Sequence, residues 1–182
     1  MRVIAGKAKG VKLKPPKGIG VRPTADRVKE ALFNILAPRI DGVYFLDLYA
    51  GSGAIGIEAL SRGAHYCVFV DYKKENTALI RDNLDITGLT EKARLITGDA
   101  EQAVIKLARD NYKAGLVYLD PPYGKTKIQP VVLSIFNHQV VDQGGLLIIE
   151  HDIKDQQWIE EFTNIRQKRY GSTCLSLISS HQ

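Results

Sequence analysis

Residues 47–63 read DLYAGSGAIGIEALSRG, and this stretch decides the fold class. It continues the apolar run VYFLDL at 43–48 and passes through Gly51, Gly53 and Gly56 into a helical pattern. Glycines at a strand-to-helix turn allow a tight bend and let a ligand approach the backbone closely. The spacing satisfies G-x-G-x-x-G and predicts the first strand–turn–helix unit of a nucleotide-binding α/β fold.

The alternation of strand and helix continues along the chain. Further apolar strands are expected at 66–71, 93–97, 114–119 and 144–150, with helices near 54–62, 73–87, 99–110 and 127–138. Continuous apolar strands are typical of a parallel sheet that helices cover on both faces. The alternation implies right-handed crossovers and a doubly wound fold.

The C-terminal part breaks this alternation. After a predicted helix at 155–162, two strands at 164–170 and 173–179 are joined by Gly171 and make the last strand antiparallel. The prediction is therefore a doubly wound, Rossmann-like sheet of seven strands, mostly parallel, with an antiparallel last strand.

The N-terminal part precedes this sheet. Residues 2–5 and 11–14 predict a small β-hairpin, and a helix is expected to start at Thr24. No repeat or linker interrupts the sequence. We expect one domain over 1–182, with residues 1–22 as a basic N-terminal extension within it.

The extension holds most of the excess charge. The whole chain has 25 Lys and Arg, 20 Asp and Glu, and a net charge of +5. Seven of the positive residues lie in 1–22, where there is no acid: Arg2, Lys7, Lys9, Lys12, Lys14, Lys17 and Arg22. Such a segment is either a solvated arm or a phosphate-contacting surface, and charge alone leaves both open.

Other classes of protein are disfavoured. Cys67 and Cys174 lie in apolar strand patterns and are expected to be small buried hydrophobes, and the four scattered histidines offer no metal-ligand spacing. No apolar run approaches the roughly 18–20 residues of a membrane span, and the N-terminus has no signal-peptide core. We expect a cytoplasmic monomer with no metal and no membrane contact.

Acidic residues near two strand ends narrow the choice of ligand. Asp47 lies four residues before Gly51, where a buried carboxylate would repel a pyrophosphate and favour an amino group or a sulfonium. Asp71, at the end of the second strand, suits the hydroxyls of a ribose. The pattern favours S-adenosylmethionine over a dinucleotide; a tight turn without a ligand is the alternative.

Residues 117–124, VYLDPPYG, carry the second motif. The prolines lack an N–H and cannot extend a central strand, so they fix an exposed geometry beyond it. Asp120 and the backbone carbonyls of Pro121 and Pro122 suit an amino group, and Tyr123 offers a face for stacking. Because ligands of such sheets bind beyond the carboxyl ends of the strands, this motif is expected beside the cofactor loop. The two motifs together predict methyl transfer to the amine of a planar base. The alternative is a rigid loop with a packed tyrosine.

D-x-x-x-G-x-G, Asp71 and the later Gly-Asp-Ala at 98–100 resemble the class I S-adenosylmethionine-dependent methyltransferases. The resemblance implies that Asp47 and the glycine loop surround the methionine part, Asp71 binds the ribose and Asp99 contacts the adenine amine. Asp99 could cap a helix at the same time. The expected cofactor-binding residues are Asp47, Tyr49, Ala50, Gly51, Ser52, Gly53, Asp71, Gly98, Asp99, Ala100 and Asp120.

MRVIAGKAKGVKL at the N-terminus, RPTADRVKEALFNIL at 22–36, the stretch 47–63 and DPPY resemble, in order and spacing, the RsmD type of bacterial 16S ribosomal RNA guanine-N2 methyltransferases. The resemblance implies methylation of a guanine N2 amine in 16S rRNA of the small ribosomal subunit or its assembly intermediate. Expected catalytic residues are Asp120, Pro121, Pro122 and Tyr123. Expected substrate contacts are Arg2, Lys7, Lys9, Arg22, Thr24, Arg27 and Tyr123.

Three alternatives remain at this stage. The first is an adenine-N6 methyltransferase acting on DNA or RNA, since DPPY identifies the amine better than the base. The second is a nicotinamide-dependent oxidoreductase that uses the glycine loop. The third is an inactive RNA-binding module of the same fold.

Overall fold

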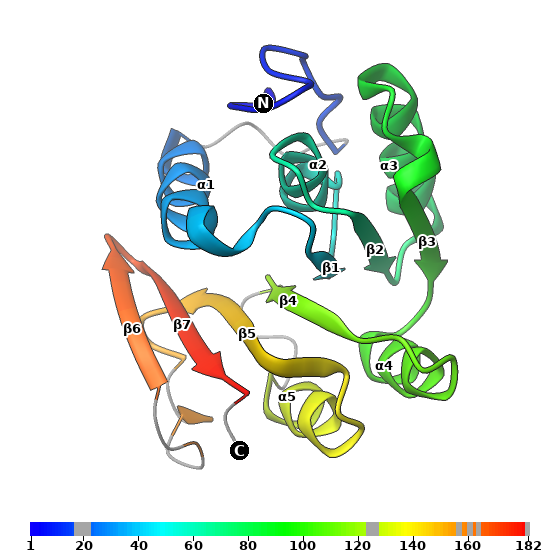
Figure 1. Cartoon of the computed structure of the whole chain (residues 1–182). Coiled ribbons are helices and arrows are strands. Elements are labelled where there is room, and N and C mark those ends of the chain that lie inside the picture. Colours follow the sequence, from blue (N-terminus) through cyan, green and yellow to red (C-terminus); the bar gives the residue numbers. More distant parts are fainter. Residues whose placement is uncertain (17–22, 123–127, 156–157, 160–161, 163–164, 181–182) are drawn as a thin grey trace.

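The computed structural model describes residues 1–16, 23–122, 128–155, 158–159, 162 and 165–180. Seven strands form one sheet in the order β3-β2-β1-β4-β5-β7-β6 (Figure 1). They are β1 (Tyr44–Leu48), β2 (Tyr66–Asp71), β3 (Ala93–Thr97), β4 (Ala114–Leu119), β5 (Val141–Asp152), β6 (Ile165–Tyr170) and β7 (Thr173–Ser179). Strands β1 to β5 are parallel, and β7 runs antiparallel to both β5 and β6. The predicted seven-stranded sheet with an antiparallel last strand is confirmed.

Helices cover both faces of this sheet. The first face carries α1 (Pro23–Leu36), α2 (Ala54–Ser61) and α3 (Lys74–Thr87), and the second carries α4 (Ala100–Arg109) and α5 (Ile128–Asn137) (Figure 1). Short 3₁₀ turns follow α1 at Ala37–Arg39 and α3 at Thr90–Lys92. Strand residues alternate between the two cores, so Phe45 packs under α1 and α2 while Leu46 faces α4 and α5. This two-sided burial is why the strands are continuously apolar.

The start of one predicted strand differs clearly from the structure. Strand β5 begins at Val141 rather than at 144, because Val141 pairs with Ala114 before a register shift that precedes the Leu116–Leu146 pair. A bulge of this kind is invisible to a search for an apolar run. The helix predicted at 155–162 falls partly outside the described residues. In the part of the chain that the structure describes, no helix combines the length and apolarity needed to cross a bilayer.

Residues 1–14 form a compact N-terminal loop over α2, in which the predicted hairpin is present but shorter than expected. The Leu13 N–H donates to the Met1 carbonyl at 3.1 Å and the Gly10 N–H to the Val3 carbonyl at 2.9 Å. The two limbs of the hairpin share one antiparallel bridge, Arg2 with Lys12, and a hydrogen bond from the Val3 N–H to the Val11 carbonyl at 3.0 Å. The next two N–H groups, of Ile4 and Ala5, donate instead to the carboxylate of Glu58 on α2. The pairing between the limbs stops after Val3, because a side chain distant in sequence takes the Ala5 N–H that a longer hairpin would need.

Candidate functional site

The acidic residues singled out from the sequence gather at one edge of the sheet. Strand β1 lies between β2 and β4, so the chain winds away from it in both directions, which is where ligands of doubly wound folds bind. Since β1 to β5 are parallel, their carboxyl ends share this edge. The acids there are Asp47 in β1, Asp71 at the end of β2, Asp99 after β3, Asp120 after β4 and Glu150 in β5.

The glycine loop between β1 and α2 borders open space. Gly51 has a φ of +57°, and a side chain built on it would meet nothing within 4 Å. Gly56 is needed for a different reason, because a Cβ at this position would lie 2.3 Å from the Phe69 ring of β2. The first glycine therefore leaves room for a ligand, and Gly56 lets α2 pack closely on the sheet.

Tyr49 begins this loop in a left-handed conformation, with a φ of +64°. Such a backbone is uncommon for a residue with a Cβ and is found at functional positions. Burial, together with the negative charges of Asp99 and Glu101, raises the pKa of its hydroxyl to about 12. Tyr49 therefore keeps its proton and lies close to the start of α4, which brings the glycine loop and the Asp99 region together.

Asp47 lies beneath the loop and is 1% exposed. Its Oδ2 accepts the N–H of Gly56 at 2.9 Å, which satisfies one of the free donors in the first turn of α2. Burial raises the pKa of this carboxyl to about 7, against the opposing effect of that hydrogen bond, and the charge of Asp71 adds to the rise. A positively charged ligand would relieve this cost, as the sequence interpretation requires.

Asp71 organises the next turn. Its Oδ2 accepts the N–H of Gly51 at 2.8 Å, and its Oδ1 accepts the N–H of Lys73 at 2.8 Å and the amide of Asn76 at 3.0 Å. The carboxylate therefore ties the glycine loop to the beginning of α3. A carboxylate has about four acceptor positions, and these contacts leave one for a ribose hydroxyl.

Asp99 caps α4, as the sequence suggested. Its Oδ1 accepts the N–H groups of Glu101 at 2.9 Å and Gln102 at 3.1 Å. The residue is exposed, Gly98 before it borders open space and Ala100 after it is buried. The cap uses one carboxylate oxygen, so the other is available to an amino group.

Asp120 belongs to an acidic cluster that the sequence did not reveal. The Tyr118 hydroxyl donates to the Glu150 carboxylate at 2.5 Å, and both residues lie on strands next to Asp120. Although Asp120 keeps an exposed surface, loss of hydration raises the pKa of its carboxyl well above the ordinary value, and the charges of Glu150 and Asp47 raise it further. The register of β1, β4 and β5, in which Asp47 pairs with Tyr118 and Leu119 with Ile149, brings the carboxyls of Asp47, Asp120 and Glu150 to one region.

Three residues at this edge were missed by sequence reasoning. Glu150 and Tyr118 lie within strand patterns and looked like ordinary strand residues. Tyr72, directly after Asp71, is 76% exposed, which is unusual for a large aromatic side chain. Its position beside Asp71, at the end of a predicted central strand, could have marked Tyr72 as a site residue in the sequence.

Only some of the residues expected to bind the substrate lie close together. Arg2 and Lys9 of the N-terminal loop line a pocket of about 420 Å³ with Arg27 of α1, and Asp26 and Glu30 line the same pocket. Lys7 is exposed nearby on the same loop. Arg22 and Tyr123 lie outside the described residues, and for Thr24 only the backbone is described. Pro121 is buried and Pro122 exposed, directly after β4.

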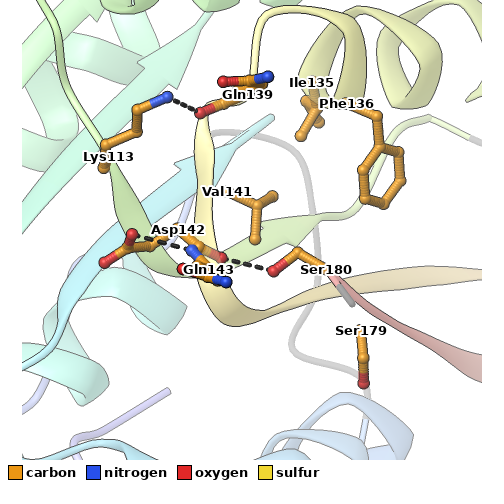
Figure 2. Close-up of a pocket in the computed structure, with 9 residues that line it drawn as sticks. All are labelled: Lys113, Ile135, Phe136, Gln139, Val141, Asp142, Gln143, Ser179 and Ser180. Atoms are coloured by element: carbon orange, nitrogen blue, oxygen red, sulfur yellow. Dashed lines mark hydrogen bonds between the residues drawn. The ribbon is translucent and has the colours of Figure 1, made fainter. Parts of the chain in front are cut away.

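A larger pocket of about 730 Å³ lies at the opposite edge of the sheet (Figure 2). Lys113 precedes β4, Val141–Gln143 begin β5 and Ser179–Ser180 end the antiparallel β7, so the pocket is at the amino ends of the parallel strands. The Lys113 ammonium donates to the Gln139 carbonyl and the Ser180 hydroxyl to the Asp142 carbonyl, as Figure 2 shows. None of the candidate site residues lines it.

Within the described residues, no group of three or more His, Cys, Asp and Glu side chains could hold a metal ion. Cys67 and Cys174 are both buried and free, as predicted. Burial raises the pKa of both thiols, so each stays protonated and packs as a small apolar side chain.

Comparisons with known proteins bear on the family and the fold. A family model described as "Conserved hypothetical protein 95" matches residues 1–179. "Putative rRNA methyltransferase YlbH" of Bacillus subtilis is 37% identical over 179 residues, 97% of each chain. "Ribosomal RNA small subunit methyltransferase D" of Haemophilus influenzae is 31% identical over 173 residues, 94% of this chain and 89% of the relative. A solved Escherichia coli structure, "Putative methyltransferase yhhF", superposes with a TM-score of 0.84 at 29% identity, over 98% of this chain and 97% of that one. The architecture is thus that of the Rossmann-like methyltransferases.

Proposed function

The chain belongs to the Conserved hypothetical protein 95 family, the family of the RsmD-type methyltransferases, and on that premise we propose that it methylates 16S rRNA of the small ribosomal subunit. The acceptor is the exocyclic N2 amine of a guanine, and the methyl donor is S-adenosylmethionine. The substrate is the small subunit or its assembly intermediate.

One observation carries the proposal. Asp47 pairs with Tyr118 across β1 and β4, and Asp120 follows two residues later at the same edge. The glycine loop that starts beyond Asp47 and the Asp-Pro-Pro motif that starts at Asp120 therefore emerge side by side. A donor on the loop and an acceptor amine at Asp120 would meet there.

The residues at this edge fit S-adenosylmethionine. The buried carboxyl of Asp47 favours a cationic group, and the open backbone at Gly51 allows close approach. Asp71 keeps an acceptor position for a ribose hydroxyl, and the second oxygen of Asp99 suits an adenine amine. The exposed ring of Tyr72 offers a face for the base.

When bound, the cofactor supplies an electrophilic methyl group on a positively charged sulfur. Asp120 holds the guanine amine by accepting one of its hydrogens, and the Pro121–Pro122 backbone presents carbonyls in a fixed position. As the nitrogen becomes positive, the Asp120 carboxylate stabilises it and accepts its proton. The raised pKa of Asp120 makes it a better proton acceptor than an ordinary aspartate.

The N-terminal loop supplies the attraction for RNA. Its described cations, Arg2, Lys7, Lys9, Lys12 and Lys14, are all exposed. The loop packs on the same face of the sheet as α1, α2 and α3, the face to which Tyr118 points (Figure 1). Phosphate contacts dominate the affinity of proteins for nucleic acids, so this loop is expected to hold the RNA beside the site.

The proposal is tested first by ligand-dependent thermal melting. S-adenosylmethionine or S-adenosylhomocysteine should raise the midpoint by several degrees at concentrations well above the dissociation constant. NAD should have no effect. Stabilisation by NAD and none by the two adenosyl compounds would overturn the cofactor assignment in favour of an oxidoreductase.

A further inference from the structure

Two side chains of α2, Glu58 and Ser61, hold the N-terminal loop against the rest of the protein. Glu58, with no exposed surface, accepts the N–H of Ile4 at 2.8 Å and that of Ala5 at 2.9 Å. Ser61 accepts the N–H of Ala8 at 3.0 Å and donates to the carbonyl of Ala5 at 2.6 Å. The basic loop is therefore a folded part of the molecule rather than a solvated tail.

A third side chain connects this loop to the glycine loop. Asn83 of α3 has no exposed surface, and its Oδ1 accepts the N–H of Lys14 at 2.8 Å. Its Nδ2 donates to the carbonyl of Lys14 at 3.1 Å and to the carbonyl of Ser52 at 2.9 Å. One amide thus touches the end of the basic loop and the middle of the glycine loop.

The amide group suits both partners at once. Its oxygen meets an N–H, and its two hydrogens meet two carbonyl oxygens, so every polar atom is satisfied in a buried place. A carboxylate of the same shape would put an oxygen against both carbonyls. A short apolar side chain would leave three backbone groups without partners, at about 1–3 kcal/mol for each unsatisfied group.

We propose that Asn83 is a positioning residue that links RNA binding on the N-terminal loop to cofactor binding on the glycine loop. The inference rests on the proposed function, since it needs both ligands. RNA that holds the N-terminal loop in place also holds Lys14, and through Asn83 it holds Ser52. Bound RNA thereby restricts motion that the glycine loop would otherwise lose on binding the cofactor, so each ligand lowers the free-energy cost of binding the other.

The direct test is a measurement of this linkage. Binding of labelled S-adenosylhomocysteine is followed by equilibrium dialysis, with and without small ribosomal subunits that lack the modification. For the wild type we expect affinity to rise at least about fivefold when subunits are present. For Asn83→Asp at pH 8 the ratio should fall to about one. A general loss of stability would lower the melting temperature but would not abolish the ratio.

A matched pair at Lys14 covers the case in which Asn83→Asp does not fold. Lys14→Ala and Lys14→Pro both remove the exposed ammonium, but only the proline removes the N–H that donates to Asn83. Both variants should therefore lose the same phosphate attraction. Only Lys14→Pro should also lose most of the linkage between subunits and S-adenosylhomocysteine.

The outcomes separate the two proposals. If the wild type binds both ligands without linkage, or if Asn83→Asp and Lys14→Pro keep the full ratio, the role of Asn83 is rejected and the proposed function stands. If the wild type binds neither S-adenosylhomocysteine nor the subunits, the proposed function fails and this inference fails with it.

Discussion

At the scale of single residues, burial of the Asp47 carboxyl reduces the stability of the folded protein, and the fold alone does not explain why an acid stands there. The group is buried, has one hydrogen bond from Gly56, and has a pKa raised to about 7 mainly by burial. A folded-state pKa above the unfolded value of 3.8 means that the native state binds the proton more tightly. Stability from this group therefore decreases as pH rises from about 4 to about 7.

Replacing Asp47 with Asn should remove this loss. Relative to the wild type, the variant should become more stable by up to about 4 kcal/mol as the pH rises from 4 to 8. Urea unfolding at a series of pH values measures the difference. A difference that stays constant with pH would mean that the pKa of Asp47 is not raised in the native protein.

Asp120 should act on the reaction rather than on cofactor binding. In Asp120→Ala the amine loses its acceptor, so methyl transfer should fall by about 100-fold or more, with S-adenosylhomocysteine affinity largely retained. Asp110→Ala is the matched control, since Asp110 is exposed and pairs with Arg94 at the surface. Unchanged methylation in Asp120→Ala would reject the role given to it.

The sequence predicted the acids near strand ends but not the side chains beside them. Asp47, Asp71, Asp99 and Asp120 each stand next to a glycine turn, a helix start or a proline, which marked them. Glu150 had no such marker, because only the register of β5 against β4 brings it beside Asp120. Register depends on pairing between distant segments, which one sequence does not display.

At the scale of elements, the N-terminal loop, α1 and α2 meet at a buried charged group. Glu58 has no exposed surface and Lys29 is 4% exposed, with 3.5 Å between Nζ and the carboxylate, while Arg62 donates to Glu58 at 2.7 Å. Burial lowers the pKa of Lys29, and the charge of Glu58 opposes that shift. The pair is tolerated because Glu58 also accepts two backbone N–H groups.

Glu58→Leu should therefore be strongly destabilising. It leaves a buried ammonium without its counter-charge and two amides without acceptors, so the expected loss is about 3–5 kcal/mol. The control, Asp82→Ala, removes the exposed pair with Lys14 and should change stability by less than about 1 kcal/mol. Urea unfolding gives both values, and equal effects of the two substitutions would contradict the buried network.

The same contacts explain why the predicted hairpin is shorter than expected, whereas the sheet agrees with the prediction. Runs such as 66–71, 93–97 and 114–119 gave strands with those bounds, because their apolar character reflects burial on both faces. Residues 2–5 carry a strand pattern as well. The N–H groups of Ile4 and Ala5 donate to Glu58, more than 50 positions away, and local patterns carry no information about such a partner.

At the scale of the whole molecule, charge and chemistry share one side. The basic loop, α1, α2 and the glycine loop belong to the same face of the sheet, whereas α4 and α5 cover the other (Figure 1). RNA attracted to the loop would thus lie against the face of the sheet from which the glycine loop and α2 project.

Substitution of Lys7 and Lys9 by Ala should weaken RNA binding and flatten its salt dependence. Two lost phosphate contacts correspond to a decrease of about 1.5 in the slope of log K against log salt. The control is the double substitution of Lys106 and Arg109 by Ala, two exposed residues on α4. An equal change of slope in both double variants would mean that the RNA does not prefer the face of the N-terminal loop.

The central claim is that the glycine loop and Asp120 present a methyl donor and a guanine amine to each other. The most direct measurement incubates the protein with S-adenosylmethionine and small subunits lacking the modification, and then identifies methylated nucleosides by mass spectrometry. The account predicts one N2-methylguanosine per subunit, absent with Asp120→Ala. N6-methyladenosine as the product, or N2-methylguanosine at full yield with Asp120→Ala, would contradict it.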